Sequence, residues 1–385
     1  MCGIIISRED LFSFTTFKEA TMIRVYLGVD FHATKIVTHR IERRSDGTVR
    51  RTNGSFFPED LLAFTRTLDQ DTYVCVEAST GVFEFCDVIR SYVKDVIVIH
   101  PNEFRRMYLS GKKTDSVDAK KLADRLKVHI EDGDAQDDFP SVWIPPATIR
   151  ELRELFSCLQ LLKTQINMQK NKLRSILRLH LNVHARDVDV VTLNIDELEL
   201  PCSTRLELHL IQGLLCSALL AKKQLEDRVR RVAIEYDEAT VKLFVTLHGI
   251  SIMGASALLA DAGCIERFKS AKKFSRYLRS APRVDSSNDT TRIGHIDKAG
   301  RKTTFGYLIE GLNNIYAGNP NYTRFYEKKC ASKSKGKVRA AIVRKTLTTI
   351  YYMWRNREEY RFTHDSSTSR KIKEIERIKN SSQVA

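Results

Sequence analysis

Apolar and polar positions alternate through the first third of the chain, which is the spacing of half-buried strands. We predict strands in "VYLGVD", which ends at Asp30, in "KIVTHRIER" and in "GTVRRTNGSF", with glycine-containing turns. The segment "PEDLLAFTRTL" changes to helical spacing, and "TYVCVEAST" and "VIVIHP" then predict two buried strands around a helix in "GVFEFCDVIRSYV". Three consecutive strands indicate a meander, and the strand-helix repeat indicates parallel additions. The pattern therefore predicts an α/β unit with a mixed sheet covered by helices.

The next part of the chain changes from a loop-like composition to helical spacing. Residues 132–148, "DGDAQDDFPSVWIPPAT", contain three prolines and a cluster of aspartates, so we expect a linker. Beyond it, apolar residues recur at intervals of three and four over almost four heptads. They are Leu152, Leu155, Leu159, Leu162, Ile166, Leu173 and Ile176. This spacing predicts a long helix with a coiled-coil seam, and the alternative is a helix that packs inside its own domain.

The last part of the chain is predicted to be mainly α-helical. A helical block over about 204–236 precedes a further region over 241–363, and the polar segment 364–385 is expected to be a flexible tail. "LHGISIMGASALLADAG", residues 247–263, indicates either half of a helix-hairpin-helix or ordinary close helix packing. The expected domains are 22–131, 132–148, 149–240, 241–363 and 364–385. A chain of 385 residues is long enough for two or three domains.

Composition narrows the classes of partner. The chain has 63 Lys and Arg against 48 Asp and Glu, which gives a net charge of +15. Such a charge is typical of a protein that binds a polyanion. Nucleic acid is the partner class that this charge favours most. A membrane surface is the alternative, but no stretch approaches the roughly 18 consecutive apolar residues of a membrane-spanning helix. The eight cysteines are scattered, with no C-x-x-C and no secretory signal peptide, so we expect reduced thiols in a cytosolic protein.

Four carboxylates stand at positions that one edge of such a sheet would bring together. Asp30 closes the first predicted strand and Glu77 the fourth, while Asp115 and Asp118 lie three residues apart on one face of a predicted helix. Taken singly, they are explained as turn residues or as solvated charges near a helix start. If the first and fourth strands are neighbours, the four carboxylates converge, and their mutual repulsion is relieved only by a cation. Ligation by oxygen alone favours Mg²⁺ or Mn²⁺.

The amino-acid sequences of the segments that contain these carboxylates also resemble those of a known family. "GVDFHATK" (residues 28–35), "VCVEASTG" (74–81) and "KTDSVDAKKLADRL" (113–126) resemble the three signature segments of insertion-sequence transposases of the IS110 and IS1111 group. The group has a RuvC-like (RNase H fold) domain of the Asp-Glu-Asp-Asp type, a proline-containing linker, a long helix and a C-terminal transposase domain. The likeness covers roughly residues 23–362. It implies that Asp30, Glu77, Asp115 and Asp118 are catalytic and bind Mg²⁺ or Mn²⁺.

The resemblance also assigns a role to a serine. "RYLRSAPRVDSSNDTTRIGHIDKAGRK", residues 276–302, predicts a polar, basic loop between helical stretches, where a serine is either a turn residue or a nucleophile. In the family, a serine of this region becomes covalently linked to DNA; counting from Pro282 and from Gly294, it is Ser287, with Ser286 the near alternative. The chain departs from the family pattern after this serine, where Asn288 and Asp289 replace glycines.

The remaining expectations concern partners and rival functions. The resemblance implies donor and target DNA, a structured guide (bridge) RNA, and a homo-oligomer, dimer or tetramer, joined through the long helices. The expected location is the prokaryotic cytoplasm, at the nucleoid. Candidate nucleic-acid-binding residues are Lys112, Lys113, Lys120, Arg292, Lys298, Arg301, Lys333, Lys335 and Lys337. The alternatives are a RuvC-like Mg²⁺-dependent endonuclease that cuts branched DNA without a serine adduct, and an inactive nucleic-acid-binding remnant.

Overall fold

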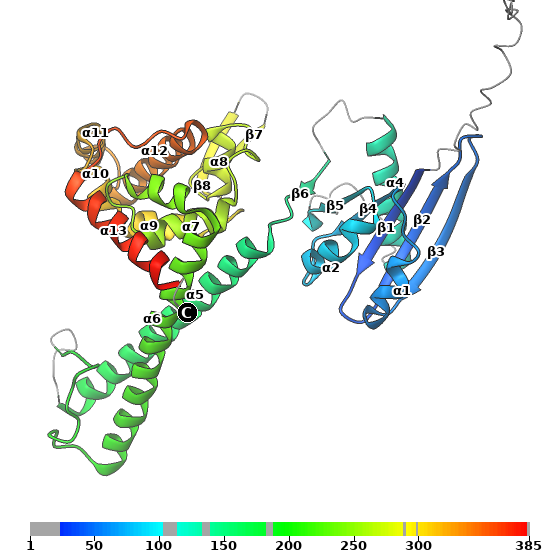
Figure 1. The fold of residues 1–385 in the computed structure, drawn as a ribbon. Helices are drawn as coiled ribbons and strands as arrows, with labels where there is room; N and C mark the ends of the chain where they lie inside the picture. Colours follow the sequence, from blue (N-terminus) through cyan, green and yellow to red (C-terminus); the bar gives the residue numbers. More distant parts are fainter. Residues whose placement is uncertain are drawn as a thin grey trace, which may run out of the picture. The chain divides into compact units, whose positions relative to one another are not determined.

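The fold consists of two compact units with the boundary between Pro145 and Pro146, and each unit is described by itself (Figure 1). The computed structural model describes residues 24–102, 114–132, 139–181, 188–287, 290–297 and 299–382. Within this part of the chain, no helix combines the length and the apolar character needed to cross a membrane.

The first unit contains a mixed sheet, as the sequence predicts, with six strands among its described residues in place of the five predicted. Its strands are β1 (Arg24–Phe31), β2 (Ile36–Arg43), β3 (Val49–Phe56), β4 (Thr72–Glu77), β5 (Asp95–Ile99) and β6 (Ser141–Val142). The order is β3-β2-β1-β4-β5-β6: β1 pairs antiparallel with β2 and parallel with β4, and β4 pairs parallel with β5. Strand β6, which pairs antiparallel with β5, lies in the segment expected to be a linker.

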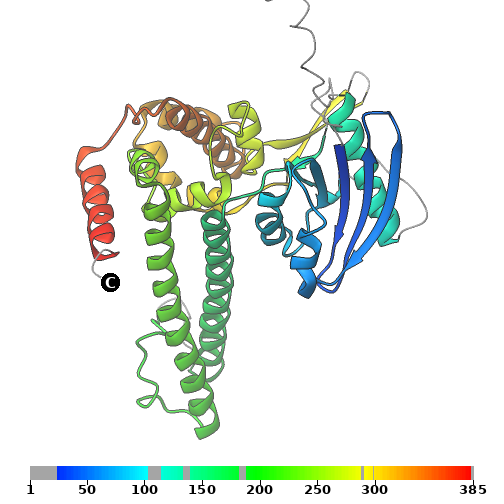
Figure 2. The ribbon, with the colours of Figure 1, turned by 45° about the vertical axis from the view of Figure 1, so that its right-hand side comes forward.

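Helices cover both faces of this sheet (Figure 2). One face packs against α1 (Leu61–Thr65) and α2 (Val82–Ile89), which the short 3₁₀ turns η1 (Pro58–Asp60) and η2 (Arg90–Tyr92) adjoin in the sequence. The other face packs against α4 (Asp115–Asp132), whose Leu122, Ala123 and Leu126 are buried against Tyr26 and Cys75. The sheet is therefore the middle layer of three, which is the arrangement expected when a parallel core is buried on both sides.

Gly28 allows α4 to lie very close to β1. Tyr26 faces α4 and the next residue faces the opposite layer, so the alternation of a strand directs Gly28 toward the helix again. A Cβ atom at Gly28 would lie 2.5 Å from the Ala123 backbone nitrogen, and closer still to the Ala119 carbonyl oxygen. Only glycine fits this contact, which lies two residues before Asp30 and one turn from Asp118.

The second unit begins with a long antiparallel helical hairpin, α5 (Ala147–Leu181) and α6 (Cys202–Val245). The apolar seam predicted on α5 faces its own chain, since Ile166, Leu173 and Ile176 are buried with Leu208 and Leu215 of α6. The helix thus packs inside its own unit, which was the alternative interpretation of the heptads. In both views the free end of the hairpin extends away from the remaining helices of this unit (Figures 1 and 2).

The rest of the second unit is mainly helical. Its helices are α7 (Ile252–Ala262), α8 (Ala271–Tyr277), α9 (Thr303–Glu310), α10 (Leu312–Ala317), α11 (Pro320–Cys330), α12 (Lys335–Asn356) and α13 (Asp365–Ser382). Helix α7 is buried on all sides, and at Gly249 before it a Cβ would press on the Ile315 backbone, which fits close helix packing. The expected domain start at residue 241 lies inside α6.

Two segments of this unit differ from the sequence-based expectation. The stretch expected to be a loop contains a β-hairpin of β7 (Pro282–Ser287) and β8 (Thr290–Ile296). The segment expected to be a flexible tail forms α13, because isoleucines at every third position from Ile372 give it an apolar face and bury Ile375 completely.

Helix α6 is interrupted once, at Asp237, whose backbone is extended with φ −155° and ψ 80°. The Asp237 carboxylate accepts hydrogen bonds from the Thr240 backbone nitrogen (2.9 Å) and hydroxyl (2.5 Å). This is the geometry of a helix N-cap, so the final two turns of α6 start afresh at this residue.

Candidate functional site

Asp30 and Glu77 lie at the ends of adjacent parallel strands. Val29 on β1 is the register partner of Val76 on β4, so the residue after each, Asp30 and Glu77, occupies the same level of the sheet. Strand alternation puts both residues on the face covered by α4, because Tyr26 and Cys75 face that helix. The carboxyl ends of neighbouring parallel strands are a common location for ligand sites in α/β folds.

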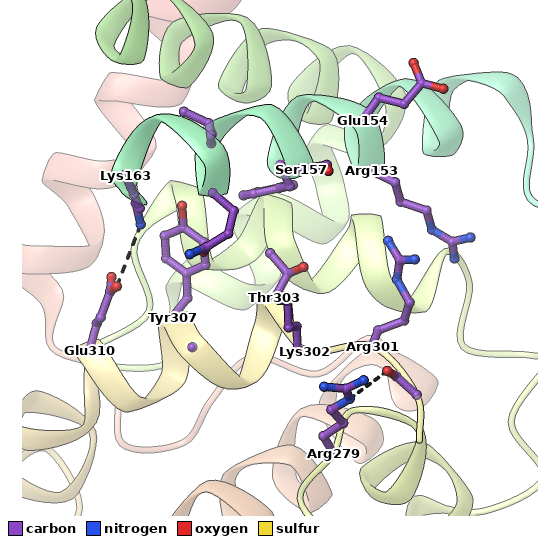
Figure 3. A pocket seen from close by; sticks show the side chains of 15 residues that line it. Arg153, Glu154, Ser157, Lys163, Arg279, Arg301, Lys302, Thr303, Tyr307 and Glu310 are labelled. Carbon is purple, nitrogen blue, oxygen red and sulfur yellow. Dashed lines mark hydrogen bonds and ion pairs between the residues drawn. The ribbon is translucent and has the colours of Figure 1, made fainter. Parts of the chain in front are cut away.

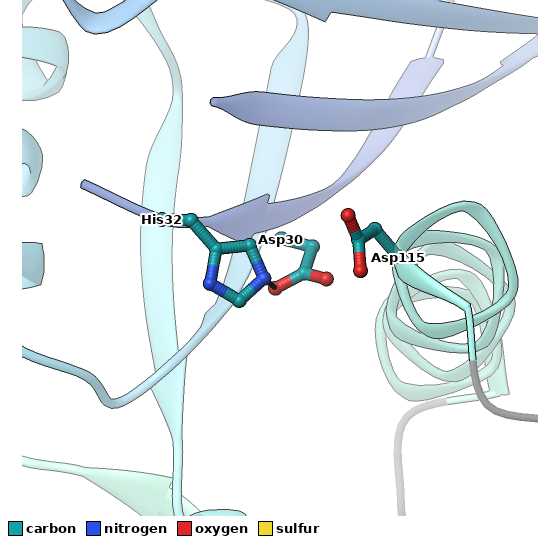
Figure 4. Close-up of side chains that lie close together, drawn as sticks. All are labelled: Asp30, His32 and Asp115. Atoms are coloured by element: carbon teal, nitrogen blue, oxygen red, sulfur yellow. Dashed lines mark ion pairs between the residues drawn. The ribbon is translucent and has the colours of Figure 1, made fainter. Parts of the chain in front are cut away.

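Helix α4 brings two further carboxylates to this edge, since Asp115 and Asp118 form its first turn. Oxygen atoms of Asp30 and Asp115 and a ring nitrogen of His32 all lie within 4.8 Å of one another. Figure 4 shows Asp115 reaching from the helix toward Asp30 at the strand end, with His32 on the other side of the Asp30 carboxylate. The His32 Nε2 atom is 3.2 Å from Asp30 Oδ1.

The electrostatics of Asp30 reflect this crowding. Burial is the main cause that raises the pKa of Asp30, and the nearby carboxylates of Asp115 and Asp118 raise it further, while His32 acts in the opposite direction. Asp118 is thus within electrostatic range of Asp30, and its Oδ1 atom is 3.4 Å from Lys121 Nζ. The carboxylates of Asp30, Asp115 and Asp118 thus crowd one edge of the sheet, which is the condition that a bound cation relieves.

The donor set fits a divalent cation. Carboxylate oxygens are the ligands that Mg²⁺ and Mn²⁺ prefer, and an imidazole nitrogen suits a transition metal. Asp30, His32 and Asp115 offer three such donors. Asp118 is near enough to raise the pKa of Asp30, and Glu77 lies at the same level of the neighbouring strand, but neither belongs to the group of donor atoms that lie within 4.8 Å of one another.

His32 was not among the residues that the sequence singled out. It lies in "GVDFHATK", two residues after Asp30, where the strand has just ended. A D-x-H spacing at the end of a strand is the signal that would have identified it, because the turn allows the side chain to fold back toward the aspartate.

The predicted serine lies on the β-hairpin of the second unit. On the backbone, Ser287 is the last residue of β7 and pairs with Thr290, while Ser286 pairs with Thr291 and Arg292 pairs with Asp285. Asn288 and Asp289 lie outside the described residues. The carboxylates belong to the first unit and the serine to the second.

The candidate nucleic-acid-binding residues fall into several groups. Lys112, Lys113 and Lys298 lie outside the described residues, and Lys120 is exposed on α4. Arg301 forms an ion pair with Asp261, with Nε 3.2 Å from Oδ1. Lys333 and Lys337 line a pocket of about 380 Å³ beside the start of α12, together with Phe325 and Lys329, and Lys335 is exposed next to it. This surface carries charge of one sign, as expected of a contact with a phosphate backbone.

Comparison with known proteins agrees with both halves of this description. The transposase family model for the IS110 Asp-Glu-Asp-Asp domain matches residues 27–181, and the model described as "Transposase IS116/IS110/IS902 family" matches residues 241–327. A segment of 78 residues, 20% of the chain, is 30% identical to the "Probable family 20 transposase" of Pseudomonas aeruginosa. That segment spans 23% of the relative. The two family models together span more than half of the chain, in the order of the two structural units, and the chain belongs to the IS110 family of transposases.

Proposed function

We propose that this protein is a DNA transposase of an insertion sequence, which cuts and rejoins DNA strands at a metal site built by Asp30, Glu77, Asp115 and Asp118. The observation that carries the proposal is the convergence of Asp30, His32 and Asp115 at the strand ends, in a chain that matches both family domains. A divalent cation, Mg²⁺ or Mn²⁺, would neutralise charge that develops on the phosphate oxygens during strand breakage.

The residues of the first unit have separate roles in this proposal. Asp30 and Asp115 hold the cation directly, Asp118 and Glu77 complete the acidic edge, and His32 orients the Asp30 carboxylate through their 3.2 Å contact. Gly28 sets the distance between β1 and α4, and so the distance between the aspartates on these two elements.

Ser287 is the proposed nucleophile, with Ser286 as the alternative. The serine oxygen forms a bond to phosphorus while the bond from phosphorus to one deoxyribose oxygen breaks. The serine proton leaves to solvent or a base, and the departing oxygen takes up a proton to become a free hydroxyl. A strand hydroxyl later attacks the phosphoserine and releases the serine, so the number of phosphodiester bonds is conserved. The position of Ser287 at the end of β7 suits a residue that must reach a substrate.

In this proposal a structured guide RNA selects the donor and target DNA sequences by base pairing with them. The protein itself contacts the nucleic-acid backbone. The net charge of +15 and the exposed lysines at the start of α12 support backbone contacts. The prokaryotic cytoplasm, at the nucleoid, is the corresponding location.

Self-association is proposed through the outer face of α6. The apolar seam of α5 is buried against α6 of the same chain and is not available to a second copy. On α6, in contrast, Leu206, Leu210 and Leu214 follow one another at intervals of four and are each about 60% exposed. A second copy of the hairpin would cover such a stripe, giving a dimer or a tetramer.

The experiment that tests the proposal combines the protein, Mg²⁺, the RNA encoded by its element and end-labelled donor DNA. The expected result is a covalent protein-DNA adduct that disappears in Ser287→Ala and persists in Ser286→Ala. Asp115→Asn should abolish strand breakage, while Asp124→Asn, a matched change on the same helix where the aspartate pairs with Arg51, should leave it intact.

Other outcomes would favour the rival functions. Cleavage that survives Ser287→Ala without an adduct would favour a RuvC-like endonuclease that uses water as nucleophile. Binding without cleavage under any of these conditions would favour an inactive nucleic-acid-binding remnant.

A further inference from the structure

The second unit contains a basic pocket of about 730 Å³ between α5 and the start of α9 (Figure 3). Among the described residues that line it, five are cationic and two are glutamates, Glu154 and Glu310. The cations are Arg153, Lys163, Arg279, Arg301 and Lys302. Of these, only Arg301 was singled out from the sequence.

The fold fixes Arg301 firmly at one wall of the pocket. Gly300 before it has φ +96°, and a Cβ there would lie 3.0 Å from the Tyr277 carbonyl carbon, so glycine is needed where this loop passes α8. The Arg301 backbone nitrogen then donates to the Tyr277 carbonyl oxygen at 2.9 Å. At the other end of the side chain, Nε pairs with Asp261, which is completely buried and also accepts from the Thr304 backbone nitrogen at 2.7 Å.

Arg153 reaches the same space from α5, on the opposite wall. Its Nε atom donates to the Ala260 carbonyl oxygen at 2.7 Å and its Nη2 atom to that of Asp261 at 3.2 Å, which holds the guanidinium in place. Figure 3 shows the guanidinium groups of Arg153 and Arg301 coming from the two walls toward each other. Burial lowers the pKa of Arg153 to about 10, and the positive charges of Arg301 and Arg267 contribute to this. Cations brought together in this way favour an anion between them.

The middle and far end of the pocket are also electropositive. Lys302 is exposed at the N-terminus of α9 and caps it without a side-chain hydrogen bond, so the helix dipole adds positive potential there. Lys163 lies over the Tyr307 ring, 4.7 Å from its centroid, and 3.7 Å from Glu310. With the Glu310 side chain 66% exposed, a pair of this kind is weak and exchanges readily for a phosphate partner.

We propose that this pocket binds backbone phosphates of a nucleic-acid strand. Guanidinium and ammonium groups are the side chains that bind phosphate oxygens, and five of the described residues that line this pocket carry one. The volume exceeds the space that one free phosphate ion fills, so it accommodates neighbouring phosphates with their sugar. The choice of a nucleic acid as the source of phosphate rests on the proposed function. The chemistry itself does not need the carboxylate site.

The test is the salt dependence of binding, measured by fluorescence anisotropy with a labelled single-stranded DNA and with an RNA of the same sequence. EDTA is present throughout, so the measurement is independent of strand breakage. The variant is Lys163→Gln/Lys302→Gln, which removes one cation from each wall and leaves the Arg153, Arg301 and Asp261 contacts in place. The control, Lys223→Gln/Lys272→Gln, removes two exposed lysines of the same unit that do not line the pocket.

For single strands, each neutralised phosphate contributes about 0.7 to the slope of log K against log salt. Loss of two contacts should therefore reduce the slope by about 1.4, on the DNA arm, the RNA arm or both, and the affected arm identifies the strand. The control should leave both slopes unchanged. Unchanged slopes in the pocket variant, or an equal reduction in the control, would overturn the proposal. A reduced slope in a protein that never cleaves DNA would support the pocket and contradict the transposase reaction.

Discussion

Replacing Gly28 by alanine tests whether the distance between β1 and α4 determines the metal site. The new Cβ would start 2.5 Å from the Ala123 nitrogen and must reach the 3.4 Å of ordinary van der Waals contact, so the helix has to move by at least about 0.9 Å. The atoms that it meets are backbone atoms of α4, which cannot rotate away. The shift moves Asp115 and Asp118 away from Asp30, because all three lie at the same end of this contact.

Two magnitudes follow from this displacement. Overpacking of a buried contact costs about 1–3 kcal/mol, so the first unit should unfold at a lower temperature. A cation such as Mg²⁺ needs its oxygen ligands at about 2.0–2.1 Å, and ligands in working sites deviate by only about 0.2 Å. Since a misplacement of about 1 Å can cost about 100-fold in rate, we expect Gly28→Ala to lose Mn²⁺ affinity and strand breakage at temperatures where it is still folded.

The assay pairs thermal unfolding with a Mn²⁺ titration by calorimetry. Gly213→Ala on α6 is the matched control: a Cβ there meets nothing within 4 Å, so this change should be neutral or stabilise by up to about 1 kcal/mol, and should leave Mn²⁺ binding unchanged. If Gly28→Ala unfolds and binds Mn²⁺ like the wild type, the close contact between β1 and α4 does not determine the site, and the argument fails.

Three further predictions concern other residues. His32→Gln should weaken Mg²⁺ and Mn²⁺ binding alike, because it removes the imidazole that orients the Asp30 carboxylate; with 52% of the side chain exposed, the fold should not change, and unchanged binding of both ions would contradict this role. Leu210→Ser should shift sedimentation toward smaller species at constant helicity; an unchanged distribution would exclude this stripe as the interface. Burial keeps the pKa of His248 below its ordinary 6.5, and the nearby His364 and Lys371 contribute to this. The folded state therefore favours neutral His248, so its contribution to the free energy of unfolding is fully present above pH 6.5 and is lost as the pH falls below that value. His248→Gln should make this decline shallower in melting experiments between pH 7 and pH 5, and identical pH profiles would argue against it.

The sheet and its acidic edge could be predicted because they depend on local patterns. Period-two alternation identifies strands, and once β1 and β4 are neighbours, Asp30 and Glu77 must share an edge. The proximity of Asp115 to Asp30 follows from the helix that packs over this face.

The partners of apolar faces could not be predicted in the same way. Heptad spacing on α5 identifies the buried face but carries no information on whether α6 or a second chain covers it. The β7–β8 hairpin was missed because its segment is mostly polar and lacks the alternation that marks a half-buried strand. The basic pocket brings together Arg153 and Arg301, which lie far apart in the sequence, through contacts with the buried Asp261.

The helical hairpin of the second unit also has a mechanical consequence. The last turns of α6 are anchored by the completely buried Val241, Phe244 and Val245, while the segment from Cys202 to Asp237 runs for about 52 Å at 1.5 Å per residue. A rotation of about 5° at the Asp237 break would carry the far end through about 4–5 Å, as the end of a lever moves about its pivot. Helix α5 runs back from that end to Lys163 and Arg153, so a force on the tip would be transmitted to one wall of the basic pocket and would change its width.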